Sequence, residues 1–142
     1  MIYIIGSLRN PEIPKLAKKI RYEGLEVFAD WYGAGEKADD AWRDYEVSQG
    51  FNFLEALKRP AAKNVFQFDK RFLDAADVVV LALPAGKSGH LELGYAIGKG
   101  KKGFILLDDP DRWDVMYQFA TDVFDDEDLL IKELKKGLSV NL

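Results

Sequence analysis

The stretch PAGKSGHLELG, residues 84–94, places the acid Glu92 and the only histidine of the chain, His90, in a glycine-rich turn. It directly follows the apolar run 78–83. A carboxylate in such an apolar setting can act as a covalent nucleophile toward a sugar carbon. A partner acid would then protonate or orient the leaving group. The structural alternative is an acid of the first helical turn, which the helix dipole favours.

The spacing around Glu92 argues against a simple capping role. A capping box needs two residues between the N-cap serine and the glutamate, whereas three separate Ser88 from Glu92. We therefore expect Gly89 to be the N-cap, with Glu92 in the first turn. His90 is a candidate catalytic imidazole or a contact to a base. With one histidine and no cysteine, metal ligation is disfavoured, so we expect neither a metal nor a cofactor.

A second candidate site follows the first apolar run, at Gly6, Ser7 and Arg9. Glycine lets the backbone approach a ligand closely. Ser7, Arg9 and a helix N-terminus can together hold a phosphate or sugar hydroxyls. The alternative is an ordinary strand-to-helix turn, with Asn10 as N-cap and Pro11 at the first helical position. Capping would leave Arg9 unexplained.

Two further acids lie beside aromatic residues. Asp30 and Trp31 follow the second apolar run, where the indole ring could stack on a base. The alternative for Asp30 is helix capping. Asp69 lies in a helical stretch next to Lys70 and Arg71, and a solvated salt link to either is the simplest interpretation.

The elements that position these residues alternate between strands and helices. Apolar runs without polar alternation predict strands buried on both faces. Helical stretches lie between them, and such alternation predicts a parallel sheet. We expect an α/β, doubly wound, flavodoxin- or Rossmann-like parallel sheet of about five strands with helices on both faces. The expected strands are 2–5, 25–28, 78–83, 103–107 and, more weakly, 120–124, and the expected helices are 11–23, 40–58 as one or two, 61–75, 90–100 and 126–136.

Details of the helical stretches give further expectations. Gly24 should end the first helix. Pro60 should end the helical stretch 40–58. The core-facing stripe of the following helix should consist of Val65, Phe68, Phe72 and Leu73. In this architecture ligands bind beyond the carboxyl ends of the strands. That rule selects the segments 6–10, 29–36, 84–90 and 108–113.

Composition limits the classes of function. The 142 residues suit a single domain, 1–142, and 48% hydrophobic with 31% charged residues is typical of globular proteins. The net charge of −4 argues against duplex nucleic acid as a partner. The longest apolar run is too short to cross a membrane, and the first residues lack the basic region of a signal peptide. With no cysteines, disulfides and thiolate metal sites are excluded, and a cytoplasmic location is expected.

Three motifs together resemble the nucleoside 2-deoxyribosyltransferase superfamily. They are 4–9 (IIGSLR), Asp69 ahead of 76–80 (ADVVV), and 89–96 (GHLELGYA). This family includes transferases that exchange bases on deoxynucleosides and hydrolases that cut the N-glycosidic bond of nucleoside 5′-monophosphates. The form of the third motif, with its preceding Gly-Lys, resembles the hydrolase-like branch more than the classical transferases.

The resemblance implies a role for each motif. Glu92, followed by Leu93 and Gly94, matches the family's nucleophile, and Asp69 matches the acid near the leaving base. Gly6, Ser7 and Arg9 match the loop that grips the 5′-phosphate. Further substrate contacts are then expected from Tyr3 or Trp31 stacking on the base, from Asp30 and His90, and from donors of Ser88 and Gly89 near the sugar. The partner would be a nucleoside or nucleotide, and the chain a homodimer or higher homo-oligomer.

The sequence also departs from the family. Classical transferases carry an Asp six residues before the nucleophile, where Gly86 stands here. The segment 108–117 does not match the corresponding transferase segment, so the base preference stays open. We therefore expect hydrolysis, with base exchange as the alternative. A nucleotide-binding module without turnover and an NAD glycohydrolase are further alternatives.

Overall fold

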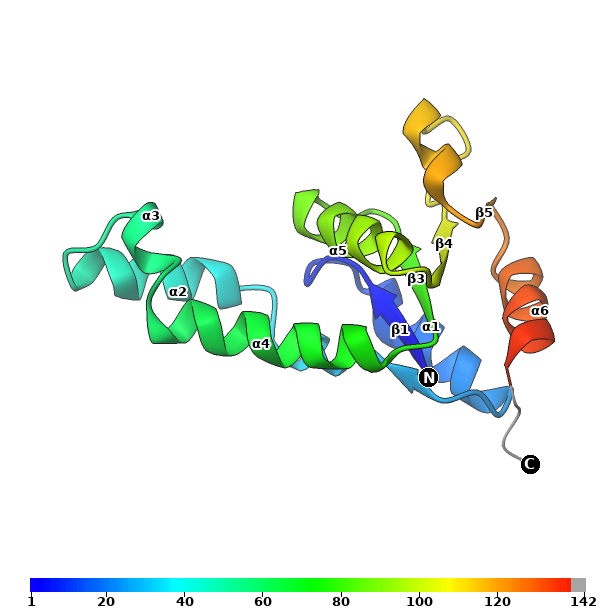
Figure 1. The fold of residues 1–142 in the computed structure, drawn as a ribbon, viewed down its shortest axis with the longest axis horizontal. Coiled ribbons are helices and arrows are strands. Elements are labelled where there is room, and N and C mark those ends of the chain that lie inside the picture. Colours follow the sequence, from blue (N-terminus) through cyan, green and yellow to red (C-terminus); the bar gives the residue numbers. More distant parts are fainter. Residues whose placement is uncertain (139–142) are drawn as a thin grey trace.

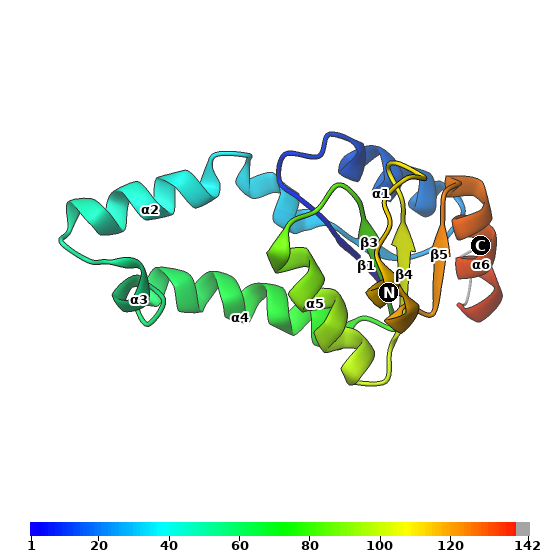
Figure 2. The ribbon, with the colours of Figure 1, turned by 90° about the horizontal axis from the view of Figure 1, so that it is seen from above.

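A computed structural model of the chain describes residues 1–138 and shows an α/β fold built on one five-stranded, all-parallel sheet (Figures 1 and 2). The strand order is β2-β1-β3-β4-β5, so the order reverses beside β1. The expected doubly wound, flavodoxin- or Rossmann-like fold is confirmed. The strands are β1 (Ile2–Ile5), β2 (Val27–Phe28), β3 (Val78–Ala82), β4 (Lys102–Leu106) and β5 (Asp122–Phe124).

Helices cover both faces of the sheet. On one face, α1 (Glu12–Tyr22) and α6 (Glu127–Gly137) pack on Ile2 and Ile4. On the other face, α5 (Lys87–Gly98) and the inner end of α4 (Pro60–Ala75) pack on Tyr3 and Ile5. Alternate residues of β1 therefore point to opposite layers, and Tyr3 points toward α4 and α5. Within residues 1–138, no helix has the length and apolar character needed to span a bilayer.

Between β2 and β3 the chain forms a helical arm that projects away from the sheet (Figures 1 and 2). It consists of α2 (Ala38–Ser48), the short α3 (Phe53–Ala56) and the outer part of α4. Inside the arm, Arg59 Nε donates to the buried Glu46 carboxylate at 2.6 Å. The same guanidinium lies 3.8 Å from the centre of the Phe51 ring. Polar and cation–π contacts therefore hold the arm's tip together.

Several predicted boundaries need correction. The stretch 40–58 is two helices, one of the two expected forms. Pro60 begins α4 and does not end the helix before it, because proline suits the first helical position. The second strand is only Val27–Phe28, shorter than 25–28. Of the predicted core stripe, Leu73 is buried and Phe72 half-buried, whereas Val65 is exposed on the arm. Phe68, at the inner end of the arm, is 41% exposed and has its ring 6.3 Å from Phe28 and 5.0 Å from Phe72.

Helix α1 ends as predicted, but it begins one residue later than predicted. Gly24 has a φ of 83°, the left-handed conformation that ends helices. The helix begins at Glu12, one residue later than predicted, with Pro11 as the residue before it. The Asn10 side chain still accepts from the Glu12 N–H at 3.0 Å. Its amide also donates to the Leu83 carbonyl at 3.4 Å, which ties the loop after β1 to the loop after β3.

Candidate active site

Three polar side chains from three elements meet on the α4–α5 face of the sheet. Tyr3 comes from β1, Asp69 from α4 and Glu92 from α5, and each affects the ionisation of another. Helix α5 starts at the carboxyl edge of the sheet and runs back across it. Glu92, five residues beyond Lys87, thus lies about 7.5 Å along the helix. Tyr3, two residues before the end of β1, lies about 7 Å inside the same edge, so the two reach the same level.

The environment of Glu92 shifts the pKa of its carboxyl group far from the ordinary value. Burial raises the pKa of its carboxyl from 4.5 to about 7. A hydrogen bond from Tyr3 lowers the pKa, and the charge of Asp69 raises it. The Oε2 atom is buried and has no hydrogen-bond partner among the described residues. The structure therefore leaves a buried carboxylate oxygen unsatisfied, which costs stability and is typical of functional groups.

Beside Glu92, Tyr3 is buried and Asp69 is half-buried. Burial raises the pKa of Asp69, and burial together with the neighbouring carboxylates raises the pKa of the Tyr3 hydroxyl. The predicted alternative, a salt link from Asp69 to its neighbours, is not what the structure shows. Lys70 pairs with Asp74 at 2.8 Å, and the Arg71 guanidinium lies 5.7 Å from the ring centres of Phe68 and Phe72 on the same helix. Asp69 is thus available as a proton donor or orienting group.

The position of Glu92 in its helix differs from the prediction. Helix α5 begins at Lys87 with Gly86 as its N-cap, so Gly89 is not the cap and Glu92 lies in the second turn. The helix-dipole explanation for this acid therefore fails, because that effect is confined to the first turn. Gly89 is buried, and an added Cβ would lie 3.1 Å from Leu81 and 3.2 Å from Ile5. Its role in the structure is close packing of α5 on the sheet.

The loop after β1 forms a tight turn and carries one exposed cation, Arg9. At Gly6 an added Cβ would lie 2.5 Å from Ile13 and 3.3 Å from the Ala82 carbonyl oxygen, so the close approach requires glycine. The Ser7 hydroxyl accepts from the Arg9 N–H at 3.1 Å. The Arg9 guanidinium is exposed and lies 3.9 Å from Asp40 at the start of the arm. This contact is weak enough for an anion to replace.

The residues after β2 lie at the same edge but are held by structural contacts. The Trp31 indole N–H donates to the Ile4 carbonyl at 2.8 Å, and its ring packs on both core layers. Asp30 is exposed and lies 3.8 Å from Arg21. Neither residue contacts Glu92 through a hydrogen bond or an ion pair within the described residues, so their predicted substrate roles stay predictions.

His90 uses both ring nitrogens inside the chain. Nδ1 lies 2.8 Å from the Gly86 carbonyl oxygen and Nε2 lies 2.9 Å from the Tyr117 hydroxyl. A neutral ring protonated on Nδ1 satisfies both contacts. His90 is therefore a link between α5 and the 3-10 helix Val115–Phe119 rather than a free base. Ser88, in the first turn of α5, is exposed.

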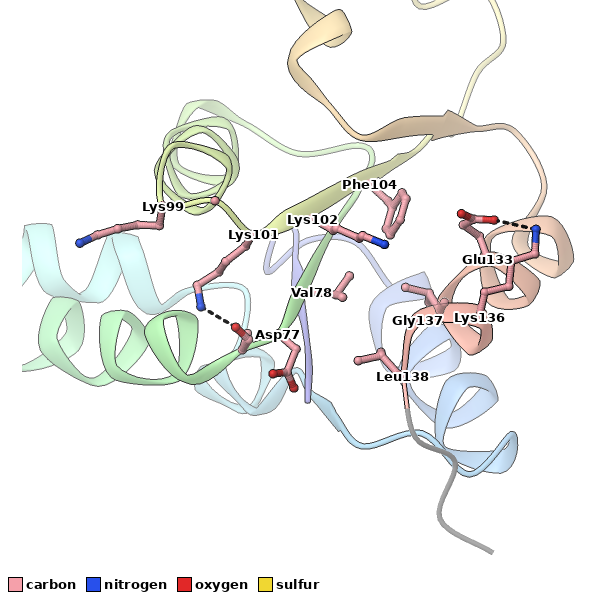
Figure 3. A pocket seen from close by; sticks show the side chains of 13 residues that line it. Asp77, Val78, Lys99, Lys101, Lys102, Phe104, Glu133, Lys136, Gly137 and Leu138 are labelled. Atoms are coloured by element: carbon pink, nitrogen blue, oxygen red, sulfur yellow. Dashed lines mark hydrogen bonds and ion pairs between the residues drawn. The ribbon is translucent and has the colours of Figure 1, made fainter.

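Two hollows of the surface lie apart from the three converging groups. One of about 450 Å³ lies between α5 and residues 114–120 and includes His90. Another, of about 440 Å³, lies at the amino ends of β3 and β4 among lysines (Figure 3). There Lys101 donates to the carbonyls of Asp74 and Ala76, which fixes the chain before β3. Neither lining includes Tyr3, Asp69 or Glu92.

The sequence did not predict the pairing of Tyr3 with Glu92. It assigned Tyr3 to base stacking, although a tyrosine inside the strand Ile2–Ile5 is itself a signal, because its hydroxyl must find a partner when buried. The link between His90 and Tyr117 had no signal in spacing, since 27 residues separate them.

Comparison of the sequence with models of known protein families finds no match, and comparison with curated proteins finds none either. The resemblance to the deoxyribosyltransferase superfamily therefore rests on the three motifs and on the residues that they contribute to this site.

Proposed function

We propose that the chain cleaves the N-glycosidic bond of a nucleoside or its 5′-monophosphate and releases the free base. The observation that carries this proposal is the convergence of Glu92, Asp69 and Tyr3 from three elements, with one Glu92 oxygen buried and unpartnered. The motif resemblance supports the choice of substrate class. A cytoplasmic location and a homo-oligomeric state belong to the same proposal.

In the proposed mechanism Glu92 attacks C1′ of the sugar. The C1′–N bond breaks with oxocarbenium character, the bonding pair leaves with the base, and Asp69 supplies a proton to it. Water then attacks C1′ and gives its proton to the Asp69 carboxylate, while the C1′–O bond of the glycosyl ester breaks and its electron pair returns to Glu92. Both acids are thus restored, with overall retention of configuration. Tyr3 orients the Glu92 carboxylate through its hydroxyl. Gly6, Ser7 and Arg9 hold the 5′-phosphate.

The raised pKa of Glu92 distinguishes two roles for this residue within the same reaction. A nucleophile must be ionised, so base release should increase as the pH rises through about 7. A general acid must be protonated, so base release should instead decrease over that interval. We propose the first role, and the direction of this limb of the pH profile tests it directly.

The experiment is an incubation with a panel of nucleosides and 5′-monophosphates, with free base followed by chromatography. Release of base by the wild type and its loss in Glu92→Gln supports the proposal. Full activity in Glu92→Gln would refute the nucleophile assignment. Addition of a second base separates hydrolysis from exchange, and Gly86 at the position of the transferase Asp favours hydrolysis. Tight binding of a nucleotide without base release would indicate a binding module instead.

A further inference from the structure

The helical arm exposes large apolar side chains along most of its length. Eight of the fifteen exposed large hydrophobic residues in the described chain lie on it, each 41 to 70% exposed. Two are on α2, and the others are Phe53, Leu54, Leu57, Val65, Phe66 and Phe68. Together they expose on the order of 900 Å², if a large side chain covers about 200 Å² when fully exposed.

Apart from Leu73, the described helices of the arm fully bury no large apolar side chain. The buried residues of its three helices are Glu46 in α2, Ala56 in α3 and Leu73 in α4, and Leu73 belongs to the sheet end. Short helices that project from a domain gain most of their stability from packing an apolar face. The arm therefore presents apolar surface that a partner must cover.

The charges of the arm are separated into two groups. Helix α2 carries four acidic residues and one basic residue, whereas residues 58–71 carry five basic residues and one acidic residue. The two groups lie on neighbouring parts of one hairpin (Figure 2). A two-fold axis through the arm would place the acidic helix of each copy against the basic segment of the other. Such self-complementarity is what a symmetric dimer interface requires.

We infer that the arm is the dimerisation surface of this chain, and that its occupant is the arm of a second copy. The exposed apolar area is close to the ~800 Å² that each partner contributes to a stable interface. The charge separation selects a second copy over a partner of unrelated charge. Asp69 directly follows Phe68 on α4, so the same helix would carry both the interface and the candidate acid.

The inference is independent of the proposed reaction, and its first test measures mass alone. Sedimentation or light scattering should give twice 16.1 kDa for the wild type. Phe66→Asp should weaken association at least about thirtyfold, because a charge in an apolar interface is a severe perturbation. The matched control is Tyr22→Asp on α1, 91% exposed and distant from the arm, which should keep the wild-type mass. A single-chain mass for the wild type over a roughly hundredfold range of concentration would overturn the inference.

A second test does not depend on the folding of Phe66→Asp. One variant carries Asp39→Lys and Asp44→Lys, which makes both parts of the arm basic. The other carries Lys58→Glu, Lys63→Glu and Arg71→Glu, which gives residues 58–71 a net charge of −2 and so makes both parts acidic. Each alone should be monomeric, and an equimolar mixture should form a heterodimer, because the acidic and basic parts again oppose each other. Failure of the mixture to associate, or stable homodimers of either variant, would overturn the two-fold arrangement.

Discussion

Replacing Glu92 with glutamine should stabilise the protein above neutral pH. The folded-state pKa of about 7 lies above the ordinary value of 4.5, so the folded protein holds this proton after the unfolded chain has released it. Stability therefore falls as the pH rises from about 4.5 to about 7 and stays lower above that interval. The difference corresponds to about 3 kcal/mol at 1.36 kcal/mol per pH unit. Glutamine keeps the shape of the protonated acid and avoids this cost.

The assay is denaturant or thermal unfolding of the wild type and Glu92→Gln at an acidic and an alkaline pH. Near pH 4 the two proteins should have similar free energies of unfolding. Above pH 8 the variant should be more stable by about 3 kcal/mol, or about 10 °C in Tm. Glu36→Gln is the matched control, because this exposed side chain stays in water in both states. A gain of equal size at both pH values, or no gain at alkaline pH, would refute the reasoning from burial.

Three further predictions address the loop, the helix packing and the orienting hydroxyl. Arg9→Ala should raise KM for 5′-monophosphates at least about tenfold and leave nucleosides unchanged, because it removes a charge-assisted contact; equal losses on both would remove the phosphate role. Gly89→Ala should cost about 1–3 kcal/mol in denaturant unfolding, whereas Gly94→Ala, where nothing lies within 4 Å of an added Cβ, should be neutral or stabilising. Tyr3→Phe should raise the pKa of Glu92 further, because its hydrogen bond lowers that pKa; a pH–rate profile unmoved or shifted to lower pH would contradict this.

The parallel arrangement and the layers of the sheet could be predicted because β1 and β3 are continuous apolar runs. The side chains of residues 2–5 and 78–83 are apolar on both faces of the strand, so both faces must be covered by helices. The alternation of strands with helices then predicts a parallel arrangement. The short second strand could not be placed as well. Leu25 is buried beside the sheet but is not part of the paired strand. An apolar residue in the sequence predicts burial, and it does not predict pairing with a neighbouring strand.

The candidate site was predictable in part. Glu92 and Asp69 could be selected from motif and residue type, but their approach to Tyr3 depends on how far α5 runs back over the sheet. That distance follows from the start of α5 at Lys87, because the observed N-cap, Gly86, lies three residues before the predicted one, Gly89. The arm could not be predicted, for a different reason. Helical periodicity marked Val65 and Phe68 as apolar stripe residues, but it cannot distinguish a stripe that faces its own sheet from one left open to solvent.

Helix α4 packs on the sheet at one end only, and it carries Asp69 near that end. A tilt of the arm therefore also moves Asp69. A helix of 16 residues is about 24 Å long, and Asp69 lies about 9 Å from the supported end while Pro60 lies about 22 Å from it. A tilt of about 10° would then move Pro60 by about 4 Å but Asp69 by less than about 2 Å. Even that smaller displacement exceeds the tolerance of aligned reacting groups. Whatever fixes the tip of the arm thus sets the placement of the acid at its base.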